Sequence, residues 1–294
     1  MRVWGILLSL ALAAEPAAPA LAKEPEPLKR TGKWVMDYAE GACHLSAAFG
    51  TGADQVIAKF SQTALGDAPR LNLYGKRLYN GEAPRSRVQV TFLPASGPTP
   101  WREATNGTIQ LASGKLPIVF VGGVRLDNQP FGEPGQAPLA PVTPDAEQAV
   151  NALSFRSSGK AITLDLETMG PPMAAMRKCL DNLIQHWGFD RAELATRQSR
   201  ARPISNPARW VGTNDYPASM TVNGASAFVS FRATVDANGS VTACDVLETT
   251  KPPEIGPHTC DLIKKRAKFA PSIDKDGKPA PDFYINRVYW KAAD

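Results

Sequence analysis

The first 22 residues constrain the chain most, because they have the pattern of a segment that directs export. Arg2 supplies a positive charge, an apolar run follows from Val3 to Ala14, and Ala20-Leu21-Ala22 matches a small-x-small cleavage site. The run is shorter than the roughly 20 apolar residues that span a bilayer. We therefore predict a signal peptide at 1–22, removed before Lys23. An uncleaved membrane anchor is the alternative.

The composition is that of a folded protein with room for two cores. The chain has 294 residues, of which 43% are hydrophobic and 21% charged, and its net charge is +5. Single domains usually contain about 100 to 200 residues. These values exclude a wholly disordered chain and a protein with several membrane spans.

Export to an oxidising compartment makes disulfides the expected state of the four cysteines. Cys244 and Cys260 lie 16 residues apart, and closing such a loop stabilises a fold by about 3 kcal/mol. We predict this pair, and Cys43 with Cys179 as the remaining pair. No CxxC occurs, and the spacing of the cysteines and histidines does not fit a zinc site. We predict neither a metal nor a cofactor.

Residues 23–188 are predicted to form a β-rich, sandwich-like domain that ends in a helix. Val88, Val90 and Phe92 alternate with polar residues, as in a half-buried strand. The helix is predicted from Gly170 to Trp187, where apolar residues recur at spacings of three and four.

Residues 189–206 contain no sustained apolar period. Arginines accumulate there instead, at positions 191, 197, 200 and 202, and Pro203 follows. We predict a solvated linker between two domains.

Residues 207–294 have the pattern of a small α+β domain. A strand around Phe231 is followed by the turn Asn238-Gly239 and by a partner strand from Val241 to Leu247. A helix is predicted from Pro257 to Phe269, and a last strand from Phe283 to Trp290.

An ordered set of short motifs in this last third resembles the TonB C-terminal domain, in particular the exported, cysteine-bearing TonB-like proteins of Gram-negative bacteria. The motifs are Asp215-Tyr216-Pro217, Val235-Asp236-x-x-Gly239-x-Val241-x-x-Cys244-x-Val246, Thr259-Cys260, Arg266-Ala267-x-Phe269-x-Pro271 and Val288-x-Trp290. The resemblance covers 207–294 and implies a helix on a three-stranded antiparallel sheet. It also implies a periplasmic location.

Full members of that family take energy at the inner membrane and pair an edge strand with a peptide of an outer-membrane receptor. The resemblance therefore implies a protein or peptide partner in the envelope, for which a TonB-dependent receptor is one candidate. The predicted binding edge consists of Phe283, Tyr284, Ile285, Asn286, Arg287, Val288, Tyr289 and Trp290. An inner-membrane-anchored energy transducer is an alternative, which requires that the signal stays uncut.

We predict no enzyme activity and no catalytic residue. Ser157-x-x-Lys160 matches a serine acyl-transfer pattern, but its surroundings indicate a turn between strands rather than a helix start. His44, His186 and His258 have no evident triad partner in the sequence. The alternative is an envelope hydrolase whose site lies in the N-terminal domain, at His44 or other converging polar groups.

A basic helix surface is predicted around Lys264 to Lys268. Export argues against nucleic acid as a partner, and charges on one helix surface are usually solvated. Apart from an uncleaved signal, a weak attraction of this surface to anionic lipid is the one membrane contact that we expect.

Overall fold

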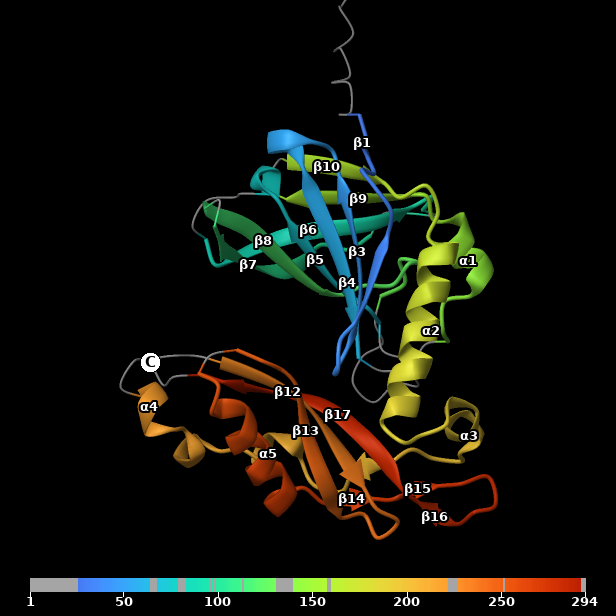
Figure 1. The fold of residues 1–294 in the computed structure, drawn as a ribbon, viewed down its shortest axis with the longest axis vertical. Coiled ribbons are helices and arrows are strands. Elements are labelled where there is room, and N and C mark those ends of the chain that lie inside the picture. The colour runs from blue at the N-terminus through green and yellow to red at the C-terminus, as the bar shows by residue number, and fades with distance from the viewer. Residues whose placement is uncertain are drawn as a thin grey trace, which may run out of the picture.

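A computed structural model describes residues 26–63, 68–78, 83–95, 97, 99–112, 114–130, 140–157, 160–221, 227–250 and 252–291. It contains a large sheet in the N-terminal part and a small sheet in the C-terminal part (Figure 1). The predicted signal peptide lies outside the described residues. Within the ranges above, no helix is both long and apolar enough to cross a membrane.

The large sheet has ten strands in the order β1-β10-β9-β6-β7-β8-β5-β4-β3-β2. Every neighbouring pair is antiparallel except β1 with β10. The strands are β1 (Leu28–Lys29), β2 (Val35–Tyr38), β3 (Cys43–Phe49), β4 (Val56–Gln62), β5 (Arg70–Tyr74), β6 (Arg85–Leu93), β7 (Arg102–Leu111), β8 (Gly114–Gly123), β9 (Ala152–Ser157) and β10 (Lys160–Asp165).

The prediction of a β-rich N-terminal domain is confirmed, but the two separate sheets of a sandwich are not found. All ten strands belong to one sheet. Arg30, just after β1, also pairs with Phe49 at the end of β3, so the sheet curls until its two sides meet. Alternating apolar residues show which face of a strand is buried, but they do not show whether the strands form one sheet or two.

The core of this sheet lies on the face that β3 lines with Cys43, Leu45 and Phe49, all buried. α1 (Pro144–Ala149) and α2 (Gly170–His186) lie beside the sheet (Figure 1), and α2 contacts β2 and β3. A disulfide joins Cys43 of β3 to Cys179 of α2, as predicted. This disulfide fixes α2 against β3 of the sheet.

The small sheet has the order β13-β12-β17, with β12 (Ala227–Val235), β13 (Val241–Thr249) and β17 (Asp282–Trp290) all antiparallel. α5 (Ile255–Arg266) packs on β12 and β13. The second predicted disulfide, Cys244–Cys260, joins β13 to α5. The predicted three-stranded antiparallel sheet with a helix is thus confirmed. The helix ends at Arg266 rather than Phe269, because Phe269 enters a short strand.

Short elements complete the chain. They are η1 (Gly52–Asp54), η2 (Lys76–Leu78), α3 (Arg191–Thr196), β11 (Arg202–Pro203), η3 (Pro207–Arg209), η4 (Thr213–Asp215), α4 (Ala218–Thr221), β14 (Phe269–Ala270), β15 (Ser272–Ile273) and β16 (Pro279–Ala280). β11 pairs with β14, and β15 with β16.

The prediction of a solvated linker at 189–206 is wrong. This segment contains α3 and β11, its Ser199 pairs with Ile273, and Ala201 is buried. Two of the arginines that suggested a solvated connector, Arg197 and Arg200, bind groups of the C-terminal part, as described below, and Arg191 pairs with Asp181 of α2. The segment therefore pairs with the short strands β14 and β15 of the C-terminal part.

Removal of the Cys244–Cys260 disulfide should destabilise the C-terminal part selectively. For the double variant Cys244→Ala/Cys260→Ala, we expect a loss of about 3 kcal/mol in the free energy of unfolding, from the entropy of the loop it closes. Urea unfolding followed at Trp210 or Trp290, with the other tryptophans replaced by phenylalanine, measures this loss. A variant as stable as the parent would show that the pair contributes nothing.

Candidate functional site

β17 is an outer strand of the small sheet. Its nine residues pair with β12, from Asp282 opposite Val235 to Trp290 opposite Ala227. No described strand pairs with it on the other side. The predicted binding edge, Phe283 to Trp290, is therefore the outer strand without its first residue. Whether it binds a partner stays a prediction.

The outward direction of the backbone follows from two hydrogen bonds. The N–H of Phe283 donates to Asp282 Oδ1, and the N–H of Arg287 donates to Asn286 Oδ1, each at 2.8 Å. These two N–H groups therefore point away from β12. Alternate residues of a strand direct their N–H and C=O groups to the same side, so Ile285 and Tyr289 point outward as well. We call the outward N–H and C=O groups of these four residues the β17 edge.

Side chains of β17 alternate between the two faces of the sheet. Tyr284, Val288 and Trp290 pack into the cores on the α5 side. The Trp290 indole donates to the buried Thr259 hydroxyl at 3.0 Å, which fixes the end of the strand to α5. Arg287 and Tyr289 lie on the opposite face, where Tyr289 is 69% exposed. The second half of β17 is therefore anchored from one face, and on the other face Tyr289 is accessible.

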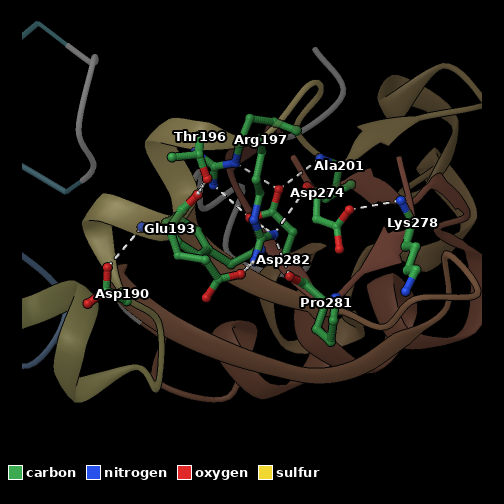
Figure 2. A network of polar contacts seen from close by, with 12 residues as sticks. Asp190, Glu193, Thr196, Arg197, Ala201, Asp274, Lys278, Pro281 and Asp282 are labelled. Carbon is green, nitrogen blue, oxygen red and sulfur yellow. Dashed lines mark hydrogen bonds and ion pairs between the residues drawn. The ribbon is translucent and has the colours of Figure 1, made fainter. Parts of the chain in front are cut away.

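Asp282 anchors the first residue of β17. Its carboxylate is fully buried and accepts a hydrogen bond from the Ala201 N–H at 2.8 Å (Figure 2). It also accepts two hydrogen bonds from the Arg200 guanidinium, at 2.8 and 2.7 Å. Burial alone would raise the pKa of Asp282, but the bonds from Arg200 and Ala201 hold this pKa below its ordinary value. The carboxylate is therefore kept ionised inside the protein.

Arg197 is the second arginine of this network, and only 3% of its side chain is exposed. It donates to the Pro281 carbonyl and to the Ser272 hydroxyl, pairs with Glu193 at 3.0 Å, and lies 3.7 Å from Asp282 (Figure 2). Sequence reasoning missed this network. The available signal was a lone aspartate at the start of an apolar strand, downstream of a group of arginines.

An aromatic cluster covers the beginning of the edge. The Phe283 ring packs against Trp187 and Phe189, with ring centroids 5.4 and 5.1 Å apart. Ile184, Leu194 and the partly buried Ile285 complete this cluster, and the Arg200 guanidinium lies 4.9 Å from the Phe283 ring centre. Figure 1 shows α2 and α3 close to β17 at this point. The accessible part of the edge therefore extends from Ile285, whose side chain the cluster covers in part, to Tyr289.

Arg287 connects the edge strand with the large sheet. Its guanidinium pairs with Glu248 of β13 at 3.3 Å, and Arg70 of β5 reaches the same carboxylate oxygen at 3.0 Å. The guanidinium also lies 4.7 Å from the centre of the Phe228 ring. These contacts hold the Arg287 side chain on the sheet face, away from the outward backbone groups.

The remaining sequence candidates lie elsewhere. His44 Nδ1 lies 2.9 Å from the Ser61 hydroxyl, and Asp37 is the strand neighbour of His44 on β2. Burial, helped by Lys59, lowers the pKa of His44. His258 Nε2 lies 2.8 Å from the Asp215 carbonyl, and His186 is the last residue of α2. The three histidines are not brought together.

The serine acyl-transfer pattern falls at a turn. Ser157 ends β9 and Lys160 begins β10, while 158 and 159 lie outside the described residues. In the part of the chain that the structure describes, no three His, Cys, Asp or Glu side chains are grouped so that they could hold a metal ion.

No protein-family model matches this chain, and no curated protein matches it either. The resemblance to the TonB C-terminal domain therefore remains a prediction that rests on the motifs.

Loss of the Asp282 carboxylate should weaken the protein strongly at neutral pH. Asp282→Ala removes the buried acceptor of Arg200 and of the Ala201 N–H, while Arg197 keeps Glu193 as a partner. Breaking a buried pair costs about 3 to 5 kcal/mol, and because 45% of the Arg200 side chain is exposed we expect a loss near the lower value. Urea unfolding at pH 7 measures the cost. Asp276→Asn, at an exposed turn, is the control and should unfold like the parent.

The same carboxylate should contribute to acid unfolding. Because its pKa is lower in the folded than in the unfolded state, its contribution is complete above the unfolded value of about 3.9 and is lost as the pH falls through the folded value. The urea concentration at the midpoint of unfolding, measured between pH 7 and pH 2, should therefore decrease less steeply with falling pH for Asp282→Asn than for the parent. Parallel curves would contradict this role.

Proposed function

We propose that the protein is a periplasmic, non-enzymatic binding protein that adds an extended segment of an envelope partner to the β17 edge. One observation carries this proposal: β17 is an outer strand, and in its accessible part the outward N–H of Arg287 is bound by the side chain of its own neighbour, Asn286. Main-chain groups on such an edge bind an extended peptide by continuing the sheet.

The surroundings of the edge favour binding by a preformed site. Asp282 fixes the first residue of β17, and the Trp290–Thr259 bond fixes the last. A strand held at both ends loses little conformational freedom when a guest strand pairs with it, so less of the interaction energy is lost on binding. The guest would pair mainly between Ile285 and Tyr289, where the aromatic cluster covers only part of the Ile285 side chain.

The resemblance to the TonB C-terminal domain supports a peptide of an outer-membrane protein as the guest, with a TonB-dependent receptor as one candidate. The energy transducer is the alternative within the same family, and it requires that residues 1–22 remain as an anchor. N-terminal sequencing of the protein from cells separates the two proposals, because a start near Lys23 removes the anchor.

Proline at Ile285 should abolish partner binding. The Ile285 N–H points away from β12, so Ile285→Pro removes an outward donor without removing a bond of the β12–β17 ladder. A photo-crosslinking amino acid at the exposed Tyr289 should trap an envelope protein in cells. We expect this crosslink to disappear with Ile285→Pro and to persist with Ile285→Val, at similar melting temperatures. Equal crosslinking by both variants would contradict strand pairing.

A hydrolase remains the second candidate, and the His44–Ser61 contact is the observation that favours it. A histidine beside a serine hydroxyl is the arrangement that activates a nucleophile. Against it, Ser61 is only 5% exposed, and no hydrogen bond or ion pair of the described residues joins Asp37 to His44.

Labelling with a fluorophosphonate should distinguish the two candidates. We expect no covalent adduct at Ser61 by intact mass, because the buried hydroxyl is inaccessible to the reagent. Labelling that is lost in both Ser61→Ala and His44→Ala would instead show an activated serine and would support the hydrolase.

A further inference from the structure

The side chain of Asn286 occupies one of the positions that a guest strand needs. Its Oδ1 accepts the outward N–H of Arg287 at 2.8 Å. Asparagine side chains that bond to nearby backbone groups compete with the hydrogen bonds of a sheet. We call this bond the edge cap. It lies in the middle of the accessible part of the β17 edge.

A hydrogen bond to Tyr284 holds the side chain of the edge cap in place. Asn286 Nδ2 donates to the Tyr284 hydroxyl at 2.9 Å, and the Tyr284 ring packs against Phe269 and Trp210, with centroids 5.1 and 5.9 Å away. Burial raises the pKa of Tyr284, so its hydroxyl stays protonated at neutral pH. Asn286 is thus fixed at both ends of its amide, by one side-chain bond and one backbone bond.

A second cap on the same strand differs in how firmly it is held. Asp282 caps the N–H of Phe283, but it is fully buried and bound by Arg200 and the Ala201 N–H. Its release would leave a buried charge without partners, which is costly. Asn286 is uncharged, only partly buried, and held by a single hydroxyl. The Asn286 cap is therefore the one that can open.

We propose that Asn286 controls access to the β17 edge, and so determines the affinity and specificity of strand pairing. This inference rests on the proposed function. In the free protein the cap satisfies the Arg287 N–H and keeps the edge from pairing with other exposed strands, in the way that natural sheets protect their edges. A guest strand must displace the Asn286 amide and offer its own carbonyl to the Arg287 N–H. A guest strand that pairs with β17 from Ile285 to Tyr289 displaces the Asn286 amide. A guest that is too short, or whose pairing is interrupted, does not displace it.

Asn286→Ala should therefore bind extended peptides more tightly than the parent. The probe is a fluorescent peptide with the β12 sequence, Ala227–Val235, flanked by lysines for solubility, because this strand-forming sequence pairs with the inner side of β17 in the fold. Exchange of one intramolecular hydrogen bond for one with the guest is worth about a 2- to 10-fold change in affinity. The same peptide with proline in place of its central phenylalanine is the pairing-deficient control.

Two further variants make the test specific. Tyr284→Phe removes the hydroxyl that holds the amide and should also increase affinity, with little added effect in the double variant. Asn72→Ala is the matched control: Asn72 and Tyr74 form the same hydrogen-bonded pair on β5, but β5 is paired on both sides. It should bind the peptide like the parent.

The outcomes separate this inference from the function on which it rests. Proline-sensitive binding that is equal in the parent, Asn286→Ala and Tyr284→Phe would overturn control by Asn286 and leave strand pairing intact. No binding by any variant, or binding that the proline peptide matches, would overturn both. Tighter binding by Asn286→Ala and Tyr284→Phe, but not by Asn72→Ala, would support both.

Discussion

The buried carboxylate of Asp282 is the interaction on which the rest of the C-terminal structure depends. It lies at the first residue of the outer strand and binds the segment that leads from the large sheet to the small one. A buried charge is tolerated only when it is paired and hydrogen-bonded, so Arg200 and Ala201 must stay beside it. The position of the edge strand and the path of the preceding segment are therefore fixed together.

The helix α2 transmits the same constraint to the large sheet. The Cys43–Cys179 disulfide joins the middle of the helix to β3, and Trp187, which follows the helix, packs on Phe283. Arg232 of β12 also lies 4.7 Å from the centre of the Trp187 ring. The start of β17 is thus held through a continuous set of contacts that begins in the core of the N-terminal part.

Much of this architecture was predictable because it rests on local patterns. The alternation around Phe231, the turn at Asn238-Gly239 and the periodicity of α2 each depend on residues close in sequence, and the structure confirms them. Both disulfide pairs were also predicted correctly. The single curled sheet and the Asp282 network were not, because each depends on residues far apart in the chain. An arginine in a polar segment looks the same in sequence whether it is solvated or bound to a buried carboxylate.

The small sheet has two outer strands, and their surroundings differ in a way that favours β17 as the binding edge. The pairing of β13 with β12 is interrupted by two irregularities, which increase local twist and make an edge a poor template for a guest strand. The end of β13 is also in close contact with the large sheet: a Cβ on Gly41 would lie 2.7 Å from the Cα of Leu247, and Glu248 pairs with Arg70. β17 instead pairs with β12 in unbroken register over its whole length. A regular strand whose accessible part carries a single cap, that of Asn286, is the better template, because displacing one uncharged side chain is the main cost of pairing there.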